Sequence, residues 1–161
     1  MDTQFHSLEG PFIHFTTNNK LFQQHYDQLV KTAKSDLFHT MIDGKDCLST
    51  KALFKTFSKK LAFPDYFGKN WDAFNECIND LEWLDYSQYV VFFKNFEQTL
   101  TKNNDELAIF LSIIEEAIQE WAEGLDYEPD RLQKPFHLVI QANEDLVGKL
   151  NNHLKATVTV F

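Results

Sequence analysis

The centre of the chain joins an aromatic loop to a compact helical pattern and reads Phe63-Pro64-Asp65-Tyr66-Phe67-Gly68-Lys69-Asn70-Trp71-Asp72-Ala73-Phe74-Asn75-Glu76-Cys77-Ile78. Trp71, Phe74 and Ile78 recur at the spacing of an α-helix, so they share one apolar face. Asn70 stands directly before them and can cap the helix through its side-chain oxygen. We therefore expect a short helix over residues 71–81, with its apolar face against a core.

The other side of this helix is polar and acidic, and it carries Asp72, Asn75, Glu76, Asn79 and Asp80. Asp72 and Glu76 lie one turn apart, where like charges are mildly unfavourable. Carboxylates at a fixed spacing suit a surface that accepts arginine and lysine side chains, because charge-assisted hydrogen bonds are strong and directional. Tyr66 and Phe67, on the preceding loop, can add the rigid aromatic contacts that interface centres favour. On these residues alone, an ordinary solvated helix face is the alternative.

Short apolar runs and helical patterns alternate on both sides of this centre. Before it, we expect a strand over 12–15, a helix capped by Asn18 or Asn19 and running through Leu29, a strand over 38–42, a turn at Asp43-Gly44, and a helix from the cap Ser49 to a point before Pro64. After it, we expect a strand over 89–93, the longest helix from Asn103 or Asn104 to Gly124, an exposed loop over 127–134, a strand over 136–140, a helix over 146–154 and a strand over 156–160. Strands that alternate with helices predict an α/β fold with a mostly parallel sheet covered by helices.

The charge of the chain is concentrated in its second half. The net charge is −9 over 161 residues, and residues 65–130 hold 16 acidic residues against three lysines, Lys69, Lys94 and Lys102. Such an arrangement repels nucleic acid and attracts a basic protein. An acidic surface that only aids solubility is the alternative. The apolar fraction of 43%, with 16 phenylalanines, argues against disorder.

The motif content argues against several other classes of protein. Cys47 and Cys77 belong to no C-x-x-C pair, so we expect buried free thiols. The six histidines form no H-x-H or H-x-x-x-H pair, which argues against a metal site. There is no G-x-S-x-G, H-E-x-x-H or P-loop motif, so we expect neither an enzyme nor a cofactor. The chain shows no signal-peptide pattern and no apolar run of membrane-spanning length, which favours a cytoplasmic protein without membrane contact.

The run over 63–78, together with Ile42-Asp43-Gly44, Leu53 and Leu61, resembles without gaps the first strand and first two helices of the barstar family, intracellular inhibitors of ribonuclease. The most specific part is Pro-acid-Tyr-aromatic-Gly-x-Asn-x-Asp-Ala-x-x-acid-Cys. The resemblance continues more loosely and covers residues 37–141 as a family-like core. Residues 1–36 and 142–161 read as strand–helix and helix–strand extensions. We expect them to pack on the core and widen its sheet within a single domain, 1–161.

The resemblance implies an immunity or antitoxin protein that blocks the basic active site of a ribonuclease or related nuclease toxin. In the family, a loop tyrosine and two acids of the second helix face that site, and the matching residues here are Tyr66, Asp72 and Glu76. The family's further acid, on the long helix, matches Glu116 or Gln119, depending on where an insertion falls. The full predicted contact set is Tyr66, Phe67, Trp71, Asp72, Asn75, Glu76, Asp80 and Glu116.

The chain also departs from the family on this same helix. Asn75 stands where the family has a tryptophan, and Trp71 stands at an apolar position of the family. The resemblance therefore does not single out barnase, the ribonuclease that barstar inhibits, as the target. A scaffold or regulator that keeps the fold but binds another protein is the alternative, because fold does not dictate function.

Overall fold

The structure is a computed structural model that describes residues 5–155 and 158–161. Strands and helices alternate along the chain as β1 (Ile13–Thr16), α1 (Asn19–Thr32), β2 (Leu37–Asp43), α2 (Thr50–Lys60), α3 (Trp71–Asp80), β3 (Gln88–Lys94), α4 (Leu107–Glu123), β4 (Phe136–Gln141), α5 (Glu144–His153) and β5 (Val158–Val160). Three short 3₁₀ helices lie between them, η2 (Gly44–Asp46), η3 (Phe96–Gln98) and η4 (Asn104–Glu106).

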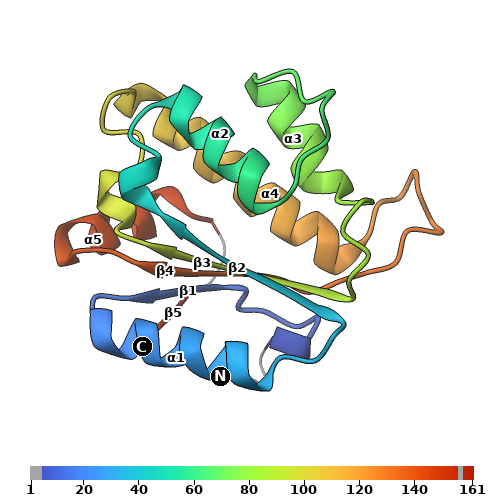
Figure 1. Ribbon diagram of the computed structural model, residues 1–161, viewed down its shortest axis with the longest axis horizontal. Helices are drawn as coiled ribbons and strands as arrows, with labels where there is room; N and C mark the ends of the chain where they lie inside the picture. The colour runs from blue at the N-terminus through green and yellow to red at the C-terminus, as the bar shows by residue number, and fades with distance from the viewer. Residues whose placement is uncertain (1–4, 156–157) are drawn as a thin grey trace.

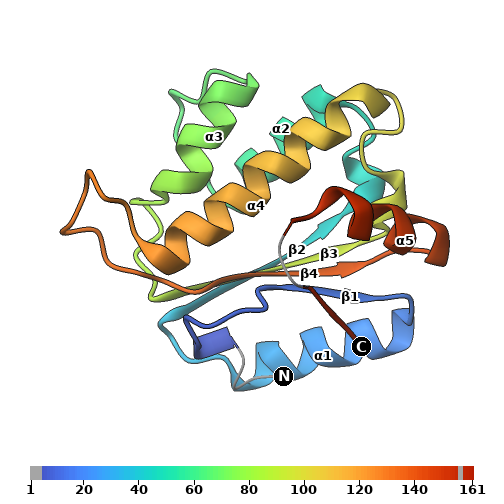
Figure 2. The same ribbon diagram turned by 180° about the vertical axis from the view of Figure 1, so that it is seen from behind.

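The strands form one five-stranded sheet in the order β2-β3-β4-β1-β5, and every pairing in it is parallel. Helices α2, α3, α4 and α5 cover one face, and α1 covers the other (Figures 1 and 2). The prediction of an α/β fold with a parallel sheet covered by helices is confirmed. The predicted widening of the sheet is confirmed as well, because β1 joins the edge of β4 and β5 joins β1.

The helix boundaries follow local signals in the sequence. The side chains of Asn18, Ser49 and Asn143 cap α1, α2 and α5, each accepting a hydrogen bond from a backbone N–H of the first turn. Two helix starts differ from the prediction. Residues 104–106 form a 3₁₀ turn, so α4 begins only at Leu107, and α5 begins at Glu144, two residues before the predicted start at 146. Of the strand expected over 156–160, the first two residues lie outside the described residues.

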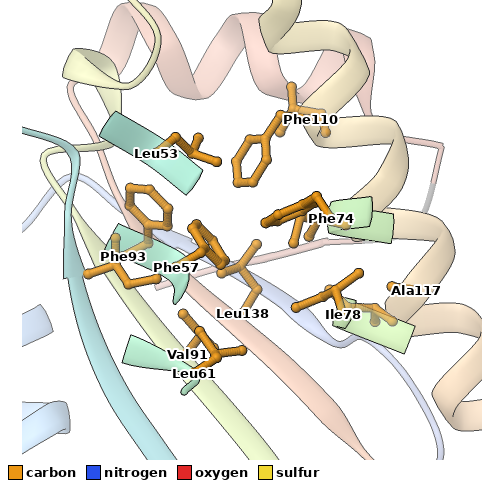
Figure 3. Packing of buried hydrophobic residues seen from close by; sticks show 14 of the residues in the cluster. Leu53, Phe57, Leu61, Phe74, Ile78, Val91, Phe93, Phe110, Ala117 and Leu138 are labelled. Atoms are coloured by element: carbon orange, nitrogen blue, oxygen red, sulfur yellow. The ribbon is translucent and has the colours of Figure 1, made fainter. Parts of the chain in front are cut away.

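The main core lies between the sheet and the layer of α2, α3 and α4. Figure 3 shows aromatic rings from several elements converging there, with Phe57 on α2, Phe74 on α3, Phe93 on β3 and Phe110 on α4. All four side chains are at most 1% exposed. Burying one such ring contributes about 1.5–3 kcal/mol relative to leaving it in water. The packing therefore fixes α3, which carries the predicted contact residues, to the rest of the fold.

A second apolar layer lies between the sheet and α1. Val90, Phe92 and Val139 point to this side and are fully buried under Phe22 and Leu29 of α1. Because α1 and β1 belong to the N-terminal extension, the extension closes a face of the sheet that the segment 37–141 alone would leave open.

We predict that the segment 37–141 does not form a stable unit by itself. Removing residues 1–36 and 142–161 would expose Val90, Phe92 and Val139, and an apolar patch of this kind promotes aggregation. Limited proteolysis of the whole chain should yield no resistant core that lacks residues 1–36. Recovery of a folded, monomeric fragment 37–141 would contradict a single domain over 1–161.

Both cysteines are free and buried, as predicted. Burial raises the pKa of the Cys47 thiol to about 12, so this side chain stays a neutral apolar filler at ordinary pH. Within residues 5–155 and 158–161, no helix combines the length and apolar character needed to cross a membrane.

Candidate protein-binding site

The helix α3 is held in place at both ends by hydrogen bonds. The Asn70 side chain accepts from the backbone N–H of Ala73 at 2.8 Å and caps the start of the helix. Near the other end, the indole N–H of Trp121 on α4 donates to the backbone oxygen of Ile78 at 3.0 Å. Phe74, Cys77 and Ile78 form the buried face; the sequence pattern predicts Phe74 and Ile78 there, whereas Trp71, predicted with them, is only half-buried. The opposite face of α3 is therefore presented from a fixed support.

Four predicted contact residues share the solvent side of α3, and we call Asp72, Asn75, Glu76 and Asp80 the acidic face. All four are exposed. Asp72 lies in the first turn, where the helix dipole favours a negative charge, whereas Asp80 is the last helical residue and opposes it. Among the described residues the one ion pair joins Lys94 to Asp43, so the three carboxylates of the acidic face lie without a cationic partner.

Tyr66 stands beside the acidic face on the loop that precedes α3. Its side chain is 71% exposed. The pKa of its phenol lies above the ordinary value because of partial desolvation and the negative charge of Asp80, with smaller contributions from Glu82 and Glu76. The negative charges of the acidic face thus act on the Tyr66 phenol.

The prediction that Phe67 contacts a partner needs a correction, because its side chain is only 8% exposed. Its ring centroid lies 5.6 Å from that of Phe54 and 5.1 Å from that of Phe63, both in the core. Neighbouring residues of the loop point to opposite sides, so Tyr66 faces solvent and Phe67 anchors the loop. Phe67 thus packs the loop that carries Tyr66 against the core.

Trp71 is half-buried at the start of α3. Its ring lies 4.8 Å from that of Phe54, and its indole N–H donates to Oε1 of Glu106 at 2.8 Å. The other carboxylate oxygen of Glu106 accepts from the Thr50 hydroxyl at 2.5 Å. These hydrogen bonds, first from Thr50 and then from Trp71, lower the pKa of Glu106. One carboxylate thereby joins the N-terminal ends of α2, α3 and α4.

The sequence pattern does not reveal that Glu106 bridges these helices. Its partners lie 56 and 35 positions earlier in the chain, and no short motif links acids to residues at such separations. The sequence predicted that the long helix begins at Asn103 or Asn104, in the same turn as Glu106, and did not indicate Glu106 itself. Asn103 instead accepts a hydrogen bond from the backbone N–H of Thr50.

The acid predicted on the long helix lines a cleft and is not part of the acidic face. Glu116 and its alternative Gln119 both line a cleft of about 960 Å³ between α4, residues 8–13 and the segment around Lys155. Glu116 is exposed and accepts a 3.4 Å hydrogen bond from Ser112. No residue of α3 lines this cleft. Of the predicted contact residues, Glu116 alone lines this cleft.

No cluster of three or more histidine, cysteine, aspartate or glutamate side chains suited to a metal ion occurs in the described ranges. What the candidate site offers is a rigid, negatively charged helix face flanked by one exposed aromatic ring. Such a surface can accept guanidinium and ammonium groups through charge-assisted hydrogen bonds and can stack against a planar cation.

The five-stranded parallel sheet and its helical cover form a small α/β protein with a barstar-like fold. The chain belongs to the barstar family, because the family model described as Barstar (barnase inhibitor) matches residues 37–141. A curated relative from Bacillus subtilis (strain 168) carries the name "Putative ribonuclease inhibitor YrdF". It is 36% identical over 80 residues, which cover 50% of this chain and 85% of that protein. The predicted resemblance is confirmed.

Proposed function

We propose that this chain is a protein inhibitor of a basic ribonuclease, and that Tyr66 and the acidic face cover the active site of that enzyme. The observation that carries the proposal is the set of carboxylates of Asp72, Glu76 and Asp80, exposed on a braced helix with no cationic partner among the described residues. Membership of the barstar family supports an inhibitory role. The name of the B. subtilis relative supports a ribonuclease as the kind of partner.

The chemistry of the site fits such a partner. An enzyme that cleaves RNA binds phosphate groups with arginine and lysine, and carboxylates on a helix present oxygen atoms where those phosphates would lie. Asp72 and Glu76 are one turn apart, with roughly 5–6 Å between their Cβ atoms. Because α3 is capped and tied to α4, little conformational freedom is lost when the complex forms.

The proposal also includes where the inhibitor acts and where it is encoded. An inhibitor of this kind acts as an immunity protein or antitoxin inside the cell that makes the nuclease, and it is encoded beside that nuclease. It has no catalytic role, and its partner is a protein and not a nucleic acid. Trp71 and Asn75, which depart from the family pattern on α3, then help to select the particular enzyme.

We predict that the double variant Asp72→Ala/Glu76→Ala inhibits ribonuclease at least about tenfold less well than the wild type. Each hydrogen bond to a charged group is worth about 1.5–3 kcal/mol, and a loss of about 1.4 kcal/mol is tenfold in affinity. The measurement is RNA hydrolysis by barnase and by other basic microbial ribonucleases, with increasing amounts of wild-type chain or variant.

The matched control removes two exposed carboxylates elsewhere, Asp27→Ala on α1 and Asp145→Ala on α5. It changes the net charge by the same amount and should inhibit like the wild type. Circular dichroism should show an intact fold in both double variants, since all four side chains are exposed. Equal inhibition by the wild type and by Asp72→Ala/Glu76→Ala would defeat the proposal.

A further inference from the structure

A loop between α4 and β4 extends away from the body of the molecule, and we call residues 125–133 the projecting loop (Figures 1 and 2, orange). It leaves α4 at Gly124, whose φ of 83° turns the chain outward. The side chains of Tyr127 and Leu132 on this loop are 77% and 73% exposed. Two large apolar groups are thus presented to solvent on the same short segment.

The base of the projecting loop is braced against α4. The guanidinium of Arg131 lies 3.7 Å from the centre of the Trp121 ring, a cation–π contact. The side chain of Gln133 donates to the backbone oxygen of Glu123 at 2.8 Å, and the N–H of Lys134 donates to the backbone oxygen of Trp121 at 2.9 Å. These contacts hold the direction of the loop, so Tyr127 and Leu132 are offered from a fixed base.

The projecting loop and the acidic face share one support, Trp121. Its ring carries Arg131 of the loop, and its N–H binds the backbone oxygen of Ile78 on α3. Asp80, at the end of the acidic face, comes two residues after Ile78. Both views in Figures 1 and 2 show the loop extending beside the C-terminal end of α3. A protein seated on the acidic face therefore meets the loop at its edge.

The charge of the projecting loop has the same sign as the acidic face. Asp126, Glu128 and Asp130 are exposed around Tyr127, while Arg131, its one cation, lies on the Trp121 ring. Glu82 and Asp85, which follow α3 in the chain, are also exposed and add further negative charge. A partner that fits both surfaces carries basic side chains with apolar groups among them.

We propose that the projecting loop is a second arm that grips the same basic protein, with Tyr127 and Leu132 as its apolar anchors. This inference rests on the proposed function and extends it. Long-range charge mainly sets the rate of association, whereas the loss of buried apolar contacts mainly raises the rate of dissociation. The acidic face thus captures the partner, and the projecting loop holds it.

The test compares binding kinetics on immobilised, catalytically inactive barnase. The variant Tyr127→Ala/Leu132→Ala should dissociate at least about tenfold faster, with an association rate and a salt dependence like those of the wild type. The control Val30→Ala removes an exposed apolar group from α1, on the opposite face of the sheet, and should behave like the wild type. Asp72→Ala/Glu76→Ala should instead slow association.

The outcomes separate the two proposals. If the loop variant keeps the wild-type dissociation rate while Asp72→Ala/Glu76→Ala slows association, the second arm is refuted and the proposed function stands. If the wild-type chain does not bind barnase, the proposed function fails for this ribonuclease and the arm fails with it. A wild-type dimer in light scattering that the loop variant abolishes would also overturn the inference, because a second copy of the chain would then cover the loop.

Discussion

Lowering the pH from 7 to 5 is expected to reduce the free energy of unfolding by about 4 kcal/mol. The cause is a pair of buried histidines, His14 on β1 and His137 on β4, whose ring nitrogens Nε2 and Nδ1 lie 2.9 Å apart. Both side chains are at most 1% exposed, and Phe5 and Phe12 pack against them. Nδ1 of His14 also hydrogen-bonds to Thr159 of β5. The pair therefore links both terminal strands to the core.

The direction of this change in the free energy of unfolding follows from the pKa values of the two histidines. Burial lowers the pKa of His14 to about 4, and burial together with the neighbouring His14 lowers the pKa of His137 to about 3. In the unfolded chain both pKa values return to about 6.5. Below that pH the unfolded state binds protons that the folded state does not bind. Each histidine therefore lowers the free energy of unfolding by up to about 1.4 kcal/mol per pH unit, until the pH reaches the pKa of that histidine in the folded state.

Urea unfolding followed by circular dichroism at pH 7, 6 and 5 measures this dependence. The control His153→Gln changes an exposed histidine on α5, and this variant should lose the same free energy of unfolding between pH 7 and 5 as the wild type. A free energy of unfolding that is constant to within about 1 kcal/mol over this range would show that the pair does not exclude protons in the folded protein.

The substitution Gly44→Ala is expected to lower the free energy of unfolding by about 3 kcal/mol or more. Gly44 is buried in the turn after β2, and a Cβ atom there would lie 2.0 Å from the backbone oxygen of Asn95. Asn95 has little room to yield, because its N–H donates to Gln141 at 2.8 Å and its side chain donates to Asp43 at 3.0 Å. The clash therefore strains the end of three neighbouring strands.

Gly148→Ala provides the matched control for this substitution. Gly148 lies in the exposed part of α5 with nothing within 4 Å of the added Cβ. Alanine there should stabilise the protein by up to about 1 kcal/mol, because glycine is unfavourable inside a helix. Thermal unfolding of both variants checks the pair of expectations. A Gly44→Ala protein that melts like the wild type would mean that the turn adjusts without cost.

The local pattern of the sequence predicted most of the fold because the signals are short in range. The caps at Asn18, Ser49 and Asn70 and the apolar stripe of α3 each depend on residues within one or two helical turns. The parallel sheet followed from the alternation of strands and helices. The delayed start of α4 was missed because a 3₁₀ turn and the first turn of an α-helix have similar sequence signals.

The candidate site was predicted less completely, because its finer features depend on distant residues. The exposure of Tyr66 and the burial of Phe67 reflect which way the loop turns over the core, and the two side chains are not distinguished by spacing alone. The hydrogen bonds of Glu106, and the pairing of His14 with His137, join residues far apart in the chain. The assignment of Tyr66, Asp72 and Glu76 as contact residues stays a prediction.

The most direct test of inhibition by an acidic surface is the rate at which the chain associates with barnase as ionic strength rises. Barnase and barstar are themselves the reference pair for electrostatically steered association, so we predict the direction of the effect and take no magnitude from that complex. We expect the association rate to fall steeply as salt is added, and Asp72→Ala/Glu76→Ala to flatten the fall. A rate that is independent of salt, with no inhibition of RNA hydrolysis, would contradict the proposed function and favour a scaffold that keeps the fold for another partner.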